Sequence, residues 1–115
     1  MISRRHRFHG YNSLRYVYRN GKVARSSTFA VKAALNEKRR GYRVAVIVSR
    51  KVNKSAVARN RMRRRLYEIV REFEDRINQP FDIAITVFQS SMLESTHSQL
   101  KSQLAKQLKE TGVIK

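Results

Sequence analysis

The sequence predicts an α+β sandwich with helices packed on a small sheet, in which a helix, two or three strands, a helix, a strand and a helix follow one another. Three observations support this prediction. Apolar residues recur at helical spacing near the start, in the middle and at the end of the chain, and they alternate or run together between these stretches. The chain has 115 residues, of which 41% are hydrophobic, so we expect a single domain, 1–115, with one modest core.

The first predicted helix covers residues 14–19. It follows a basic segment, 1–10, that we expect to be a mobile arm. Leu14, Val17 and Tyr18 stand at positions i, i+3 and i+4, which gives this helix one apolar side. The pair Asn20-Gly21 is typical of a helix end.

Up to four strands are predicted, at 22–26 (a candidate short strand), 28–35, 42–49 and 81–88. The second alternates, with Phe29, Val31, Ala33 and Leu35 on a better-buried face and Lys32 on the other. The third and fourth are rich in Val and Ile, which is typical of buried strands.

A long helix is predicted from Ser55 or Asn53, either of which can cap it, to about Ile77. Its apolar side gathers Met62, Leu66, Ile69, Val70 and Phe73. A last helix, capped by Ser91 or Ser95, has leucines at three-to-four-residue spacing. The segment from the third strand to the fourth is therefore a β-α-β unit, and such crossovers are normally right-handed.

The charge of the chain is large and uneven. The net charge is +18, and residues 1–65 hold 20 of the 26 basic residues but one acid, Glu37. Such a charge favours a polyanionic partner, either a nucleic acid or, as the alternative, an anionic membrane surface. There is no cysteine for a disulfide or thiolate site, and no apolar run of membrane-spanning length. We expect a cytoplasmic protein that binds nucleic acid.

The densest basic signal is the segment Ser49–Arg65, which has eight basic residues in 17 positions and no acid. Five arginines lie at the start of the long helix, where the helix dipole disfavours cations. Phosphates can approach both the free N–H groups of a helix start and the guanidinium forks. This pattern therefore predicts a helix that binds a phosphate-bearing partner rather than a merely solvated one.

This segment resembles the Arg-Asn-Arg signature of the bacterial ribonuclease P protein subunit family. The counterparts of that signature and its surroundings are Arg50-Lys51, Ala56-Val57, Arg59-Asn60-Arg61 and Arg63-Arg64. The resemblance extends over nearly the whole chain, more weakly outside this segment. It implies an α-β-β-β-α-β-α two-layer sandwich like the second domain of some ribosomal proteins, with a left-handed β-α-β crossover.

The resemblance also implies a function. The family protein binds the catalytic RNA of ribonuclease P, and that RNA, acting with Mg²⁺, removes the 5′ leader from precursor tRNA. This chain would be an endoribonuclease subunit without catalytic or metal-binding residues of its own. It would be a monomer within the ribonucleoprotein, and a cleft between its first helix and the sheet would hold the single-stranded leader.

Two sets of site residues follow from the resemblance and the charge pattern. The set expected to bind the catalytic RNA is Arg50, Lys51, Lys54, Arg59, Asn60, Arg61, Arg63, Arg64 and Arg65. The set expected to line the leader cleft is Phe8, Leu14, Tyr18, Phe29 and Lys32. Leu14 and Lys32 stand where aromatic residues are common in the family, so leader binding here is expected to depend more on charge than on stacking.

Two alternative functions remain open, and one further prediction concerns Tyr16. A ribosomal or ribosome-assembly protein of similar fold would share the charge and the architecture. A protein nuclease would need His6 and His9, or the pair Glu68 and Glu72, but a phosphate contact and surface ion pairs are the favoured interpretations. Tyr16 lies off the apolar side of the first helix and is predicted to be exposed.

Overall fold

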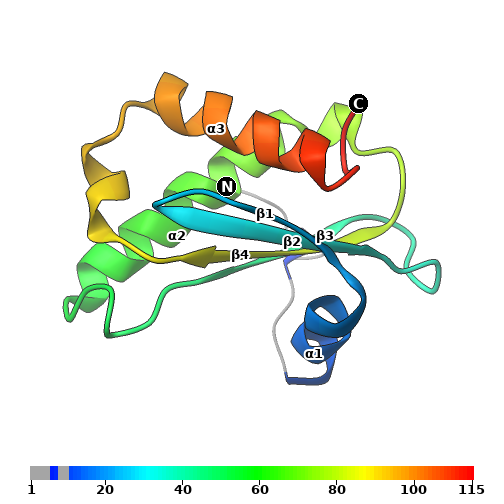
Figure 1. Ribbon diagram of the computed structural model, residues 1–115, viewed down its shortest axis with the longest axis horizontal. Coiled ribbons are helices and arrows are strands. Elements are labelled where there is room, and N and C mark those ends of the chain that lie inside the picture. The colour runs from blue at the N-terminus through cyan, green and yellow to red at the C-terminus, as the bar shows by residue number, and fades with distance from the viewer. Residues whose placement is uncertain (1–5, 8–10) are drawn as a thin grey trace.

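A four-stranded sheet with helices on both faces forms the framework of the computed structural model, which describes residues 6–7 and 11–115 (Figure 1). The elements are α1 (Tyr11–Asn20), β1 (Lys22–Arg25), β2 (Phe29–Leu35), β3 (Arg43–Ile47), α2 (Ala56–Glu72), β4 (Phe81–Val87) and α3 (His97–Glu110). Two 3₁₀ turns, η2 (Glu74–Arg76) and η3 (Ser90–Glu94), precede β4 and α3. The α+β class and the predicted order of elements are confirmed.

The strand order in the sheet is β1-β2-β4-β3. β2 pairs antiparallel with both β1 and β4, whereas β3 pairs parallel with β4. Because β3 and β4 are parallel neighbours joined through α2, the predicted β-α-β unit is present. Its left hand, which the family resemblance implies, stays a prediction.

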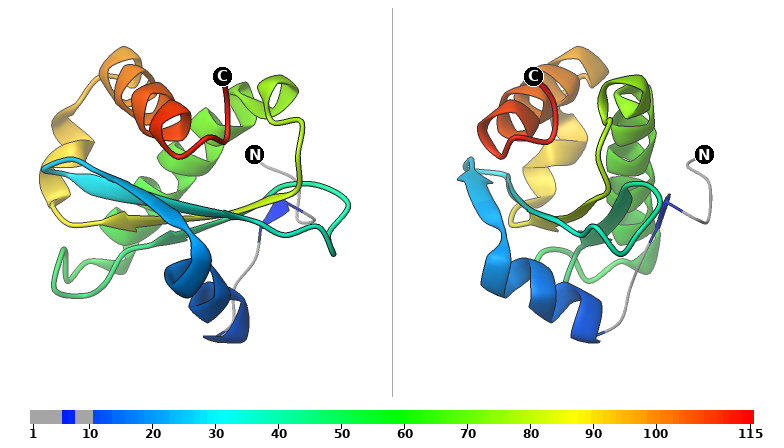
Figure 2. Two further views of the ribbon diagram at one scale, coloured as in Figure 1. Left: turned by 45° about the vertical axis from the view of Figure 1, so that its right-hand side comes forward. Right: turned by 90° about the vertical axis from the view of Figure 1, so that its right-hand side faces the viewer.

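The two faces of the sheet are covered unequally, by α2 and α3 on one side and by α1 on the other (Figure 1, Figure 2). The main core lies under α2 and α3 and includes Phe29, Val31 and Ala33 of β2. The smaller cluster under α1 joins Val17 to Ala45 and Ala84. The period-two alternation of the strands decides which side chains belong to which cluster. None of the described helices is both long and apolar enough to span a membrane.

Gly21 joins α1 to the sheet at a close approach of two backbones. Its N–H donates to the Val17 carbonyl at 2.8 Å. A Cβ at this position would lie 2.6 Å from that carbonyl oxygen and 3.0 Å from the carbonyl oxygen of Ala33. Glycine therefore lets α1 turn directly into β1 while it stays packed against β2.

The helix ends differ in detail from the predicted ones. Ser55 caps α2 as predicted, with its hydroxyl accepting from the Ala58 N–H. The prediction that α2 reaches Ile77 was wrong, because the chain turns at Phe73 into η2. The predicted caps of α3 were also wrong: Thr96 caps it in a reciprocal capping box with Gln99, which satisfies two backbone donors at once.

An ion-pair cluster centred on Glu72 links the end of α2 to the start of α3. One carboxylate oxygen lies 2.8 Å from His97 Nε2 and the other lies 3.1 Å from Lys101 Nζ. The sequence predicts a packed or half-buried His97, but its side chain is 56% exposed. Desolvation opposes ionisation of Glu72, but the hydrogen bonds from His97 and Lys101 outweigh it and lower the pKa of its carboxyl below 4.5.

This lowered pKa predicts a small acid-dependent contribution to stability. A carboxyl whose pKa is lower in the folded state stabilises the fold above its unfolded pKa, and this stabilisation is lost as the pH falls through the folded pKa. We expect Glu72→Gln to lower the free energy of unfolding by less than about 1 kcal/mol at pH 7, because the cluster is exposed to solvent. Once the pH has fallen well below the lowered pKa of Glu72, the variant and the wild type should converge. Urea unfolding at both pH values checks this, and an equal difference at both would contradict it.

Candidate nucleic-acid interface

A basic surface covers the start of α2 and the loop before it, and we name it the α2 surface. Seven residues of the predicted RNA-binding set form this surface, and their side chains are exposed or half-buried. They are Arg50, Lys51, Lys54, Asn60, Arg61, Arg63 and Arg64. The Arg63 guanidinium donates to the Asn60 side-chain oxygen, which orients both side chains on the outer face of the helix. Six cations next to a helix N-terminus form a surface suited to phosphate.

Buried polar contacts hold the loop of the α2 surface in place. The Ser90 hydroxyl of η3 donates to the Val52 carbonyl at 2.7 Å and accepts from Asn53 Nδ2 at 3.2 Å. Asn53 Oδ1 also accepts from the Ser55 N–H at 2.9 Å. The loop is therefore anchored to the far end of β4, and its lysines project from a fixed backbone.

The side chains of Arg59 and Arg65 bind backbone carbonyls of neighbouring segments. The Arg59 guanidinium donates to the carbonyls of Asn53 and Lys54 at 2.9 and 3.0 Å, so it closes the loop onto the helix. The half-buried Arg65 donates to three carbonyls around η3, those of Met92 (3.2 Å), Leu93 (3.3 Å) and Ser95 (2.8 Å). These contacts make Arg65 a clamp between α2 and η3, and its predicted contact with RNA stays a prediction that the variant Arg65→Met tests.

This difference in role predicts a difference in phenotype. We expect Arg65→Met to lower the free energy of unfolding by about 2 kcal/mol, because the variant leaves carbonyls around η3 without their charged donor. The salt dependence of RNA binding should stay that of the wild type, since no phosphate contact is removed. Urea unfolding and RNA titrations at several salt concentrations check this. A changed salt slope with unchanged stability would instead return Arg65 to the outer surface.

The face of the sheet under α1 brings together three of the residues predicted for the leader cleft. Leu14 packs beside the cluster under α1. Lys32 Nζ donates to the Tyr18 carbonyl at 2.5 Å and lies 5.7 Å from the centre of the Tyr18 ring. Tyr18 is 44% exposed, so its ring stands beside a cation at the rim of this face. This arrangement can stack an unpaired base and hold its phosphate.

Phe29 does not belong to this face, and its predicted place in the cleft was wrong. It is fully buried in the main core under α2 and α3, on the face of the sheet opposite Lys32. Residues three apart on a strand point to opposite faces, so Phe29 and Lys32 cannot line one cleft. Phe8 lies outside the described residues.

Arg25 and Phe88 were missed and extend the face under α1. The Arg25 guanidinium lies 5.1 Å from the centre of the Phe88 ring, which is 37% exposed. Side chains alternate between the two faces of a sheet, and both residues lie on the face away from the main core. Arg25 pairs with Ala30, the neighbour of the core residue Phe29, and Phe88 follows the core residue Val87. The alternation within 81–88 was the sequence signal that could have found Phe88.

The described part of the N-terminal arm lies along the free edge of β3. Arg7 forms a parallel bridge to Val44. The His6 ring stacks on Tyr42 at 4.0 Å, and its Nδ1 lies 2.8 Å from the Tyr42 carbonyl oxygen. His6 is thus a docking residue, not the free phosphate or solvent contact that the sequence suggested. His9 lies outside the described residues.

The nuclease alternative finds no support among residues 6–7 and 11–115. No group of three or more His, Cys, Asp or Glu side chains within them could hold a metal ion. Glu72, one of the two carboxylates considered, pairs with His97 and Lys101 instead.

Comparison with known proteins shows which family of proteins the chain resembles in sequence and in fold. A family model described as Ribonuclease P matches residues 2–112. The ribonuclease P protein component of Bacillus cereus (strain AH187) is 27% identical over 112 residues, which cover 97% of this chain and 96% of that protein. The solved structure of the Staphylococcus aureus RNase P protein aligns with a TM-score of 0.82 at 24% identity, covering 96% of this chain and 98% of that one. The solved structure of the Thermotoga maritima RNase P protein aligns with a TM-score of 0.71 at 23% identity, covering 81% of this chain and 86% of that one.

Proposed function

The chain belongs to the ribonuclease P protein family, and on this premise we propose that it binds the catalytic RNA of ribonuclease P through the α2 surface. The α2 surface supports this proposal because its exposed arginines and lysines are backed by a loop anchored to η3. Arginine forks bind phosphate oxygens in pairs, and each phosphate contact releases counterions from the RNA. Family membership favours this function over that of a ribosomal protein of similar fold.

We propose in addition that the face under α1 holds the single-stranded 5′ leader of precursor tRNA. Leu14, Tyr18 and Lys32 are the residues expected to contact it, and Arg25 and Phe88 extend the same face. Figure 2 shows α1 on one face of the sheet and α2 on the other, so the face under α1 and the α2 surface belong to different layers. The protein would therefore bind two RNA segments at once and hold the substrate next to the catalytic RNA.

In this proposal the chemical step belongs to the RNA, and Mg²⁺ acts with the RNA. The described residues of this chain offer no cluster of ligands that fits the ion. The chain's own contribution is to bind, to orient and to reduce repulsion between the two RNAs by placing cations between their phosphates. We propose that the protein is monomeric within a cytoplasmic ribonucleoprotein.

A reconstitution experiment tests the proposed function. Protein freed of RNA should leave precursor tRNA intact, whereas protein, cognate catalytic RNA and Mg²⁺ together should remove the 5′ leader. The protein should also lower the concentration of Mg²⁺ or of substrate that the reaction requires. Gel analysis of a 5′-labelled precursor checks each outcome. Cleavage by the RNA-free protein would contradict the proposal, and ribosomal RNA as the main copurifying species would favour the ribosomal alternative.

A further inference from the structure

α1 has two sides beside its buried face, and the proposed leader site accounts for one of them. On a helix, Leu14 and Tyr18 lie to one side of the buried Val17, while Tyr16 and Asn20 lie to the other. Tyr16 is 39% exposed, and none of the predicted site residues lies on its side of the helix. The pocket on the Tyr16 side of α1, which we name the Tyr16 groove, is therefore not accounted for by the proposed leader site.

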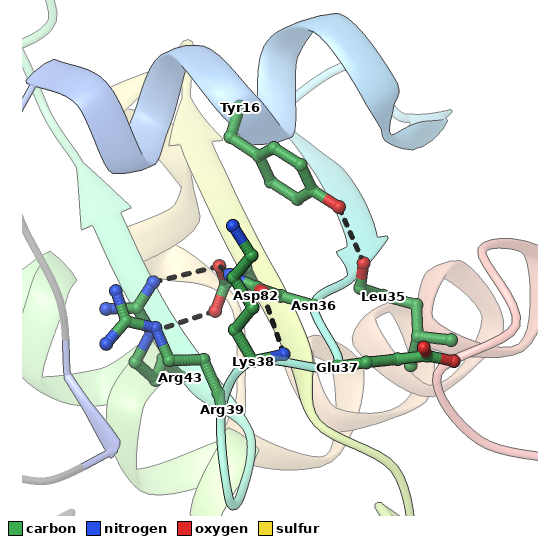
Figure 3. A pocket seen from close by; sticks show the side chains of 8 residues that line it. All are labelled: Tyr16, Leu35, Asn36, Glu37, Lys38, Arg39, Arg43 and Asp82. Carbon is green, nitrogen blue, oxygen red and sulfur yellow. Dashed lines mark hydrogen bonds and ion pairs between the residues drawn. The ribbon is translucent and has the colours of Figure 1, made fainter.

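The Tyr16 groove is a pocket of about 670 Å³ between α1 and the turn that joins β2 to β3 (Figure 3). Tyr16 forms one wall, the end of β2 lies below it, and Lys38, Arg39 and Arg43 bring cations to the side facing the turn. Figure 3 shows the Arg39 and Arg43 side chains directed to the same end of the pocket. Both arginines also line a neighbouring pocket of about 420 Å³ that reaches Arg40 and His6, so the two pockets form one basic path.

The cations of this path are available to a ligand to different degrees. Arg43 is bound to Asp82 through two hydrogen bonds of 2.9 Å. Lys38, Arg39 and Arg40 are exposed, and no hydrogen bond or ion pair joins their side chains to another described residue. Asp82 is already paired with Arg43. Glu37 is therefore the remaining acid among the residues that line the two pockets, whereas Lys38, Arg39 and Arg40 contribute three exposed cations. The path therefore attracts an anion.

The ring of Tyr16 is held in a fixed orientation. Its hydroxyl donates to the Leu35 carbonyl at 2.9 Å, which ties the ring to the end of β2. Tyr16 also lines a further pocket of about 310 Å³, together with Arg15, Arg19 and Asn20. An exposed aromatic ring between two basic hollows is the arrangement that proteins use to stack a base while cations hold the flanking phosphates.

We propose that the Tyr16 groove is a second binding site for single-stranded RNA, with an unpaired base on the Tyr16 ring and its phosphates at Arg39 and Lys38. The proposal rests on the proposed RNA-binding function and adds a strand contact on the side of α1 opposite Tyr18. The strand can come from precursor tRNA or from an unpaired loop of the catalytic RNA, and the experiment distinguishes the two sources.

Binding titrations with a fluorescein-labelled oligouridylate test the site in the isolated protein. In a Tyr18→Ala background, which removes stacking at the proposed leader site, Tyr16→Ala should weaken binding about tenfold, because base stacking on the Tyr16 ring is lost. Tyr16→Phe should retain most of the affinity, since it loses the hydroxyl but keeps the ring. Arg39→Gln should reduce the slope of log affinity against log salt by about 0.7. Lys106→Gln, which removes an exposed cation from α3, should leave the affinity within about twofold of the wild type.

The source of the strand follows from crosslinking in the reconstituted holoenzyme. The chain contains no cysteine, so Glu37→Cys provides one attachment point for an azidophenacyl group at the edge of the groove. Crosslinks to precursor tRNA identify the substrate as the source, and crosslinks to the catalytic RNA identify the ribozyme. Lys106→Cys, labelled in the same way, should give neither product.

Failure of this site is distinguishable from failure of the proposed function. If the variants at Tyr16 and Arg39 bind as the wild type does and the Glu37→Cys probe crosslinks to no RNA, the Tyr16 groove is not an RNA site. If the holoenzyme nevertheless assembles and removes the leader, the proposed function stands. Circular dichroism and urea unfolding of Tyr16→Ala check its fold, and the exposed Arg39→Gln variant tests the site independently of that fold.

Discussion

Replacing Arg61 and Arg64 together with glutamine is expected to weaken binding of the catalytic RNA by about a hundredfold at moderate salt. Both side chains are exposed on the α2 surface, and each can form charge-assisted bonds to phosphate. The loss of one such contact costs roughly tenfold in affinity, and the slope of log affinity against log salt should fall by about one per arginine. Filter binding of labelled RNA at a series of salt concentrations measures both quantities.

The matched control is the double change to lysine. Arg61→Lys with Arg64→Lys keeps two charges but loses the planar forks that bind phosphate in pairs. It should retain the salt slope of the wild type and lose part of the affinity. The free energy of unfolding should change by less than about 0.5 kcal/mol in both double variants, because the side chains are exposed. An unchanged affinity and slope for the glutamine variant would show that the RNA binds elsewhere.

Breaking the buried pair between Arg43 and Asp82 is expected to have the largest effect on stability. Asp82 has no exposed surface, and its carboxylate receives two bonds of 2.9 Å from Arg43 and a third of 2.9 Å from Asn36 Nδ2. Arg43→Ala leaves this charge buried with one amide partner, which should cost about 3–5 kcal/mol. Since domains of this size are stable by roughly 5–15 kcal/mol, the variant should be near the limit of folding.

A double variant distinguishes the net contribution of the ion pair to stability from the cost of leaving the Asp82 carboxylate buried without Arg43. Arg43→Met with Asp82→Leu replaces both charges by apolar side chains of similar size, so it should recover much of the stability that Arg43→Ala loses. Urea unfolding at one pH and one salt concentration measures all three proteins. A loss below about 1 kcal/mol for Arg43→Ala would mean that water reaches the carboxylate. Because Arg43 also lines the Tyr16 groove, its variants are unsuitable as tests of RNA binding there.

The sequence predicted the secondary structure well wherever one periodicity dominated. The leucine spacing of α3 and the apolar side of α2 correspond to buried residues such as Leu66, Leu100 and Leu104. The alternation of β2 also separated Phe29 from Lys32 correctly. Placing both residues in one cleft followed the family resemblance against that alternation, and the alternation was right, because a strand cannot turn residues three apart to the same face.

Helix boundaries were less predictable, since several residues can cap a helix. Ser91, Ser95 and Thr96 all carry a hydroxyl suited to this role. Thr96 has Gln99 three residues later, which completes the reciprocal capping box. The turn η3 occupies the residues before it, and Arg65, which is distant in the sequence, fixes that turn through its carbonyls.

By itself the sequence determined the order of the elements, the inner and outer faces of β2 and the concentration of charge in residues 1–65. These properties depend on periodicity and composition, which are local. The tertiary structure alone decided that Arg65 is a clamp, that Arg43 neutralises Asp82 and that Tyr16 stands between two basic hollows. The partner of a long polar side chain is set by which distant segment packs beside it, and no local pattern in the chain specifies that neighbour.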